Sequence, residues 1–232
     1  MVAAERTYTV EALTEALSTR ISNGDFDVGS WIRQARIAQE YGVSRTPVTL
    51  ALSKLEAVGV VEQVANRGFR VRTPSTHDIL EVLEVRALLE GHAAELAAAR
   101  ISGEQLAHLF EAVEAFRGVV NDARSGDVAP DELRGRWHGA NALFHKTVFD
   151  AAGNRQLVES AEYLHRRVPR NISWVAMGAD PRILAQNSHV HEAIAIAIDL
   201  RDGNRARTLS IEHMDMARDI LLTRFRESGP TP

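Results

Sequence analysis

The sequence predicts a mainly α-helical protein in two parts: three helices with a β-hairpin, followed by an all-helical antiparallel bundle. Apolar residues recur at helical spacing through most of the chain. The stretch with strand-like alternation lies at residues 60–72, between these two helical regions. From residue 79 onward, six helical segments are separated by short turns that contain glycine or asparagine.

The composition limits the classes of protein to which the chain can belong. It has 232 residues and no cysteine, which excludes disulfides and thiolate metal sites. No apolar run approaches the roughly 18 residues that a membrane span needs, and the first residues lack an export pattern. We therefore expect a soluble cytoplasmic protein without membrane contacts. The net charge is −4, yet residues 20–72 carry +3, which favours local contact with phosphates.

Three helices are expected before residue 60. They run from Val10 to Ile21, over residues 32–40, and from Ser44 to the turn at Val58-Gly59. Pro47 is compatible with the third helix because it falls in the first turn, where a backbone N–H has no helical partner. The apolar residues of this helix recur at helical spacing and should face a core: Val48, Ala51, Leu52 and Leu55.

The exposed end of the third helix is the first candidate site. It follows a tight turn at Gly42 and presents hydroxyls, an arginine and the positive end of a helix dipole. These groups favour contact with DNA phosphates and base edges, although an ordinary helical hairpin with a polar end has the same pattern. The residues concerned are Ser44, Arg45, Thr46 and Thr49.

A β-hairpin follows the third helix. It pairs residues 60–64 with residues 69–72 around a turn at Ala65–Gly68. Gly68 gives this turn the freedom to adopt a positive φ and to approach DNA closely, and Arg67 beside it could enter a groove. A plain hairpin would explain the turn alone, but after a helix-turn-helix it predicts a wing. We therefore expect residues 1–73 to form a winged helix-turn-helix domain that binds DNA.

The remaining chain is expected to be helical. Residues 74–77 read as a short linker, residues 78–228 as an all-helical domain, and residues 229–232 as a loose tail. Bundles of this kind build ligand sites among side chains that point inward.

Histidines give the bundle a candidate metal site. Asn141 and His145 are four residues apart and share a helical face. His191 and His213 lie eleven residues before and nine residues after the turn at residues 202–204, so a helical hairpin places them at the same height. Three imidazoles and a side-chain oxygen can hold a divalent ion, although each histidine taken singly is more often a core residue.

The N-terminal motifs resemble the DNA-binding domain of the GntR family of bacterial transcription regulators. The resemblance rests on Gly42–Val48, Ala51-Leu52, Leu55-Glu56, Gly59–Val61 and Asn66–Gly68. Two positions where the family usually has arginine hold Ala35 and Thr49 here, and Leu50 replaces a glutamate. We therefore expect a flatter salt dependence and an operator of its own. The DNA-contacting residues are expected to be Arg36, Ser44, Arg45, Thr46, Thr49, Arg67 and Gly68.

The bundle is similar to the helical FCD domain of the FadR-like branch of that family. The resemblance implies that Asn141, His145, His191 and His213 bind zinc, nickel or a similar ion, with Asn141 where relatives have aspartate. It also implies a small carboxylate effector beside the metal, which Arg86 would help to bind. Alternatively, Arg86 forms an ion pair at the helix surface with Glu90, four residues later. His138 is the reserve metal ligand, since it lies seven residues before His145.

Two functions are compatible with these patterns. The first is a homodimeric regulator, a repressor, that binds a pseudo-palindromic operator in double-stranded DNA and is released by a small carboxylate. The second is a metal-dependent hydrolase or lyase with a structural N-terminal module. The metal-binding segment offers no glutamate as a general base, so the sequence favours the regulator over an enzyme.

Overall fold

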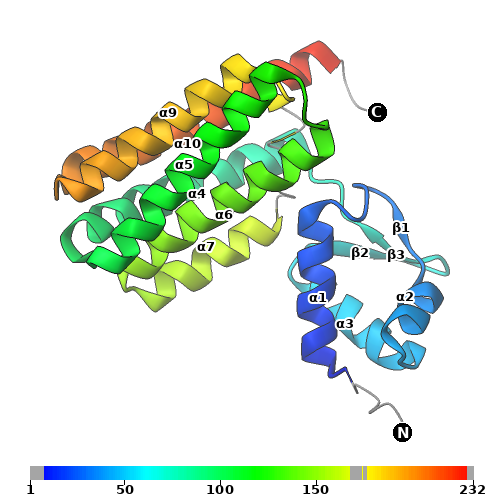
Figure 1. Cartoon of the computed structure of the whole chain (residues 1–232). Coiled ribbons are helices and arrows are strands. Elements are labelled where there is room, and N and C mark those ends of the chain that lie inside the picture. Colours follow the sequence, from blue (N-terminus) through cyan, green and yellow to red (C-terminus); the bar gives the residue numbers. More distant parts are fainter. Residues whose placement is uncertain (1–7, 168–173, 175–176, 229–232) are drawn as a thin grey trace, which may run out of the picture. The chain divides into compact units, whose positions relative to one another are not determined.

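The computed structural model describes residues 8–167, 174 and 177–228, which form two compact units (Figure 1). The N-terminal unit extends to Ser75 and includes the end of α7 from Tyr163 on, whereas the second unit contains the other helices that follow Thr76. Among the described helices, none is long and apolar enough to cross a membrane.

The N-terminal unit contains three helices, α1 (Val10–Asn23), α2 (Gln34–Tyr41) and α3 (Arg45–Ala57). Thr9 caps α1, since its hydroxyl oxygen accepts the N–H of Ala12 at 3.2 Å. The helices pack through one stripe each, as their periodicity predicts. The buried side chains of this stripe include Leu13, Leu17, Ile21, Ile37, Val48, Ala51, Leu52 and Leu55.

A three-stranded antiparallel sheet completes this unit, in the order β1-β3-β2. It contains β1 (Trp31–Ile32), β2 (Val61–Val64) and β3 (Gly68–Val71). The predicted hairpin is confirmed, and Gly68 has the expected positive φ, +97°. The prediction of a helix over residues 32–40 was wrong at its start, because Ile32 pairs with Phe69 and α2 begins at Gln34.

The second unit is an all-helical bundle. Its described helices are α4 (Thr76–Arg100), α5 (Gly103–Ser125), α6 (Pro130–Ala152), the part of α7 (Arg155–Arg167) up to Glu162, α9 (Pro181–Asp199) and α10 (Gly203–Ser228). The predicted mainly α-helical fold, a winged helix-turn-helix followed by a bundle, is therefore confirmed. Two residues assigned to the linker, Thr76 and His77, begin α4. Part of the helix predicted over residues 154–175 lies outside the described residues.

Helix α4 is central in the bundle and packs against α6, α9 and α10 (Figure 1). The turn between α9 and α10 is tied to the end of α4 by Arg201, which has a positive φ of 59°. Its guanidinium donates to the carbonyl oxygens of Ala98 at 3.1 Å and Ile101 at 3.0 Å. These bonds satisfy carbonyls that the end of a helix leaves without a partner, and they fix the α9–α10 hairpin against α4.

Gly91 marks a close approach between α4 and α10. A Cβ atom at this position would lie 2.9 Å from Cγ1 of Ile211 on α10. We expect Gly91→Ala to lower the free energy of unfolding by about 1–3 kcal/mol, since overpacking forces side chains and backbone to shift. Urea unfolding followed by circular dichroism measures this change.

Gly139→Ala on α6 is the matched control. A Cβ there meets no described atom within 4 Å, so the helix should gain up to about 1 kcal/mol. Equal effects of the two substitutions would contradict close packing at Gly91.

Candidate DNA-binding face and histidine site

The start of α3 presents polar groups that form no helix cap. Ser44 stands at the N-cap position, yet its side chain makes no capping hydrogen bond within the described part of the chain. Arg45 and Thr46 follow it and are exposed. The hydroxyl, the guanidinium and the N–H groups of the first turn can therefore all contact an anion, as a DNA phosphate requires.

A cleft of about 450 Å³ lies between the start of α3 and the turn of the wing. Three arginines line it, and all three are exposed: Arg33, Arg45 and Arg67. Gly68 lines the same cleft, so the structure brings Arg45 of the predicted recognition helix together with Arg67 and Gly68 of the predicted wing. A concave surface with this charge suits the DNA backbone.

Gln34 lies against both elements of this face, and no local pattern in the sequence predicts its role. The hydroxyl of Thr49 on α3 donates to Oε1 of Gln34 at 2.7 Å. A Cβ atom at Gly68 would lie 3.6 Å from Nε2 of Gln34. The Thr49 hydroxyl, predicted to contact DNA, is therefore engaged within the protein and positions Gln34 beside the wing.

Not every predicted contact residue lines the cleft. Arg36 is exposed on α2, but its neighbour Ala35 is the residue that faces the cleft. Trp31 and Arg33 line the cleft as well, and both were missed because the sequence indicated a helix from residue 32. Their position depends on the pairing of β1 with β3, which joins segments far apart in the chain.

The second candidate site lies inside the bundle, where three buried histidines from three helices meet. His145 on α6, His191 on α9 and His213 on α10 each offer a ring nitrogen, and these nitrogens lie within 4.8 Å of one another. The rings of His191 and His213 are 4.4 Å apart between centroids. The predicted pairing across the α9–α10 turn is therefore confirmed.

Hydrogen bonds fix which ring nitrogens can bind a cation. Nδ1 of His191 lies 2.9 Å from the carbonyl oxygen of Asn187, so Nδ1 carries the proton and Nε2 keeps its lone pair. This Nε2 is buried and has no hydrogen-bond partner among the described residues, and the same holds for Nδ1 of His213. Burying a ring nitrogen without a hydrogen bond or a bound cation lowers the stability of the folded protein.

The protonation of the histidines suits a metal site. Burial, and to a smaller extent the nearby imidazole of His145, lower the pKa of His213 to about 3. Burial also holds the pKa of His191 well below its usual range, with smaller contributions from His213 and His145. Both rings are therefore neutral near pH 7, which is the form that binds zinc or nickel.

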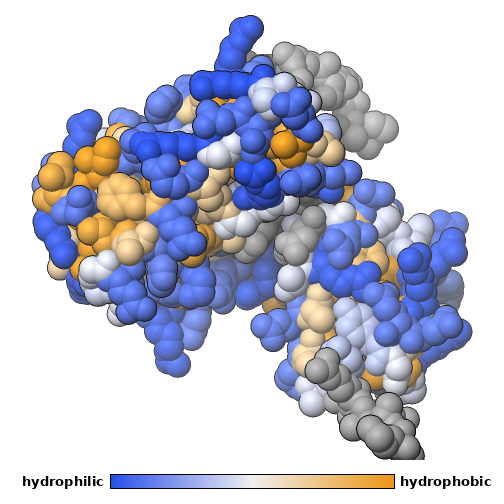
Figure 2. All heavy atoms as spheres, viewed as in Figure 1, coloured by the Kyte–Doolittle hydropathy of each residue, from blue (hydrophilic) through white to orange (hydrophobic). Residues whose placement is uncertain are grey.

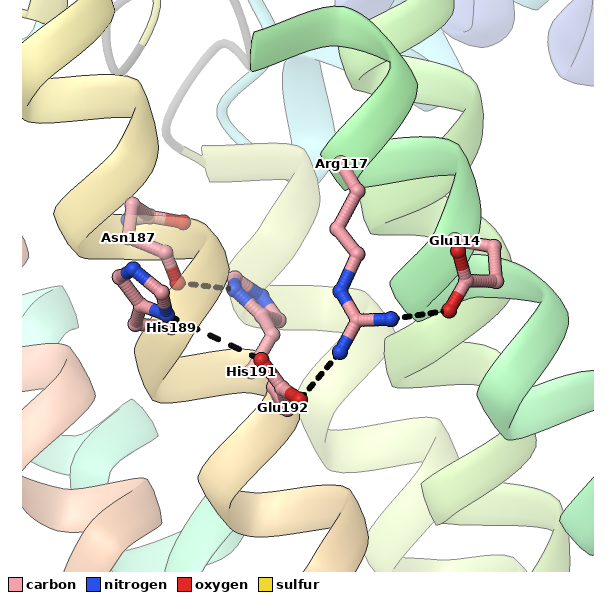
Figure 3. Close-up of polar contacts among 6 residues, drawn as sticks. All are labelled: Glu114, Arg117, Asn187, His189, His191 and Glu192. Carbon is pink, nitrogen blue, oxygen red and sulfur yellow. Dashed lines mark hydrogen bonds and ion pairs between the residues drawn. The ribbon is translucent and has the colours of Figure 1, made fainter. Parts of the chain in front are cut away.

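Figure 3 shows how α9 holds His191 in place. The Asn187–His191 bond lies along α9, and Arg117 on α5 forms ion pairs with Glu114 and with Glu192, the neighbour of His191. This bridge links α5 to α9 at the level of the site. His189, two residues before His191, is exposed and lies 3.8 Å from the Glu192 carboxylate. It takes no part in the cluster, as its spacing predicts.

The Arg86–Glu90 ion pair is present but buried. The guanidinium of Arg86 lies 3.1 Å from Oε1 of Glu90, and the two side chains are 14% and 5% exposed. The alternative prediction, an ion pair of Arg86 with Glu90, is therefore confirmed in its partner. It was wrong in placing this pair at the helix surface, because both side chains are largely buried. The other oxygen of Glu90 lies 2.9 Å from Nδ1 of His145, which makes Glu90 a residue of the site that the sequence did not predict.

The space at the cluster is small. A cavity of about 10 Å³ is lined by residues that include Glu90, His145, Ser210 and His213. This volume suits one ion or one water molecule. A carboxylate effector therefore needs side chains to move, or a space outside this cavity.

Two further predicted ligands, Asn141 and His138, lie on α6, the helix that carries His145. Asn141 is one turn before His145 and is half-buried, and its role as a fourth ligand stays a prediction. His138 is not among the three histidines that converge.

Comparison with known proteins bears on both sites. Residues 9–71 match the family described as "Bacterial regulatory proteins, gntR family", and residues 81–216, more than half of the chain, match the "FCD domain". The chain belongs to the GntR family. It is a transcription regulator with an FCD domain rather than an enzyme, and the members of this family bind operator DNA.

Curated relatives and solved structures are consistent with this GntR assignment. The chain is 28% identical over 209 residues to the "Probable D-xylose utilization operon transcriptional repressor" of Paenarthrobacter nicotinovorans, which covers 90% of this chain and 87% of the relative. It is 25% identical over 206 residues to the HTH-type transcriptional repressor GlaR of Escherichia coli (strain K12), covering 85% and 89%. Its fold is similar to that of E. coli McbR/YncC, with a TM-score of 0.78 and 22% identity over 97% and 99% of the two chains.

Proposed function

We propose that this GntR-family regulator is a homodimeric repressor whose operator affinity is set by a small carboxylate bound beside a divalent ion. In this proposal residues 1–73 bind DNA, and residues 78–228 bind the ion, the effector and the second subunit. The observation that carries the proposal is the convergence of three buried imidazoles, two of which have ring nitrogens without a hydrogen-bond partner among the described residues.

The donor set fits zinc or nickel. His145, His191 and His213 supply nitrogen ligands, and Asn141 is proposed to add an oxygen. When bound, the ion would attract a carboxylate, since this ligand set carries no negative charge of its own. Arg86 is proposed to bind the same carboxylate, because its Nε is buried and lacks a hydrogen-bond partner among the described residues.

Features of both the DNA-binding domain and the helical bundle support a dimer. Two recognition helices can enter successive major grooves of a pseudo-palindromic operator only when two subunits are joined. Apolar residues gather at one end of the bundle, where α9 ends and α5 begins (Figure 2), and exposed apolar residues in this part of the chain are Ile196 on α9 and Leu200 directly after it. An exposed patch of this kind is typical of an interaction surface.

Purified protein and the DNA upstream of its own gene provide the test. We expect an electrophoretic shift with that DNA, about one bound metal ion per chain by elemental analysis, and a dimer by light scattering. The regulator proposal fails if the protein shifts no upstream DNA with or without metal. Absence of bound metal after incubation with zinc or nickel would contradict only the metal-dependent part.

A further inference from the structure

The buried carboxylate of Glu90 contacts both Arg86 and His145. Its side chain is 5% exposed, with Oε1 3.1 Å from the Arg86 guanidinium and Oε2 2.9 Å from Nδ1 of His145. Among the described residues it is the one acidic side chain that is buried. Electrostatic interactions are stronger away from water than at the surface, so each partner of this carboxylate affects its interaction with the other.

The contact with His145 prepares that ring for a cation. A carboxylate at 2.9 Å requires the proton to be on Nδ1, which leaves the lone pair of Nε2 for a metal. A carboxylate behind a ligating histidine fixes the orientation of the ring and increases its basicity. Because the proposed ligands themselves carry no charge, Glu90 is also the negative charge nearest to His145 among the described contacts.

The contact with Arg86 works in the opposite direction. The positive charge of the guanidinium partly cancels the electrostatic field of the Glu90 carboxylate at His145 and so weakens the interaction between Glu90 and His145. One N–H of this guanidinium, at Nε, is buried without a hydrogen-bond partner in the described structure. Arg86 is therefore only partly satisfied by Glu90, and it can accept a further anionic partner.

We propose that Glu90 is a positioning residue that couples the occupancy of Arg86 to the affinity of His145 for metal. This inference rests on the proposed metal and effector function. A carboxylate that binds Arg86 draws the guanidinium away from Glu90, so that Glu90 interacts more strongly with His145 and the metal is held more tightly. By linkage, a bound metal then increases the affinity for the carboxylate by the same factor.

Zinc binding by the full chain tests the coupling without an effector. Zn²⁺ is titrated against a coloured chelator for the natural protein, Glu90→Gln, Arg86→Gln and the double variant. The amide oxygen of Gln at position 90 can still accept the hydrogen bond from Nδ1–H of His145 but carries no charge, so zinc affinity should fall about 10–100-fold. Arg86→Gln leaves the Glu90 carboxylate to His145, so affinity should rise about fivefold or more. The double variant should show no such rise relative to Glu90→Gln.

Glu95→Gln is the matched control. Glu95 also lies on α4 and pairs with an arginine of α10, Arg207, at 2.8 Å, but it does not line the histidine cavity. Its loss should leave zinc affinity unchanged. Thermal melting by circular dichroism checks folding, and the double variant, which removes both buried charges, provides a comparison free of an unpaired arginine.

Two results would overturn the inference while the proposed function stands. One is equal zinc affinity in Glu90→Gln and Glu95→Gln. The other is that Arg86→Gln raises zinc affinity by the same factor in the natural protein and in Glu90→Gln. Arg86 would then act on the metal through its own charge and not through Glu90. A natural protein that binds no zinc would instead overturn the proposed metal function, and the inference with it.

Discussion

Replacing His213 with alanine is expected to lower the affinity for zinc or nickel by more than about 100-fold, because loss of a ligand should exceed the effect of losing an outer partner. The His213 ring lies 4.4 Å from that of His191 and 5.7 Å from that of His145, so it completes the convergence. Its Nδ1 is buried without a hydrogen-bond partner among the described residues. Elemental analysis of protein incubated with each ion, followed by desalting, measures the loss.

The fold should tolerate this substitution. Alanine is compatible with the helix and removes a buried polar atom that has no hydrogen-bond partner among the described residues. His191→Ala should have the same effect on metal content, since both histidines belong to one site. His189→Ala is the control, because this exposed histidine lies on the same helix and outside the cluster. Unchanged metal content in both His191→Ala and His213→Ala would remove the assignment of the site.

The pairing of His191 with His213 could be predicted from the sequence because a helical hairpin imposes its own register. Residues at similar distances from a short turn meet at the same height, and the turn at residues 202–204 contains glycine. The buried face of α3 was predictable for a similar reason, since its apolar residues repeat at the helical period. Both inferences use only information within one or two neighbouring elements.

Glu90 could not be placed in the site by the same reasoning. It lies 55 residues from His145 in sequence, and the contact depends on the packing of α4 against α6. Arginine and glutamate four residues apart usually form an exposed pair, so their burial could not be predicted from this spacing. The start of α2 was missed for a related reason: β1 has only two residues, and its partner strand lies in the wing.

The departures from the usual GntR pattern acquire a structural meaning at the cleft. Ala35 faces the cleft, whereas Arg36 beside it does not line it, so the adjacent arginine does not replace the family's usual one. Thr49 stands where the family usually has arginine, and its hydroxyl donates to Gln34 of the protein itself. Arg33, Arg45 and Arg67 remain as the cationic groups that line the cleft.

Arg45→Ala is accordingly expected to weaken operator binding about 10–100-fold, the loss typical of one arginine contact to a base or phosphate. Fluorescence anisotropy with labelled upstream DNA, repeated at several salt concentrations, measures both affinity and its salt dependence. Arg205→Ala, at an exposed position in the first turn of α10, should leave both unchanged. Equal affinity of Arg45→Ala and Arg205→Ala would exclude the start of α3 from the DNA contact.

The salt dependence distinguishes the kind of contact and tests the role of Ala35. If Arg45 contacts a phosphate, its loss lowers the slope of log K against log salt concentration by about one, whereas a base contact changes the sequence preference instead. Ala35→Arg restores the family's usual charge at the cleft, so the slope should become steeper by about 0.9. An unchanged slope in Ala35→Arg would mean that DNA does not approach this side of the cleft, and the phosphate contacts would then have to come from α3 and the wing alone.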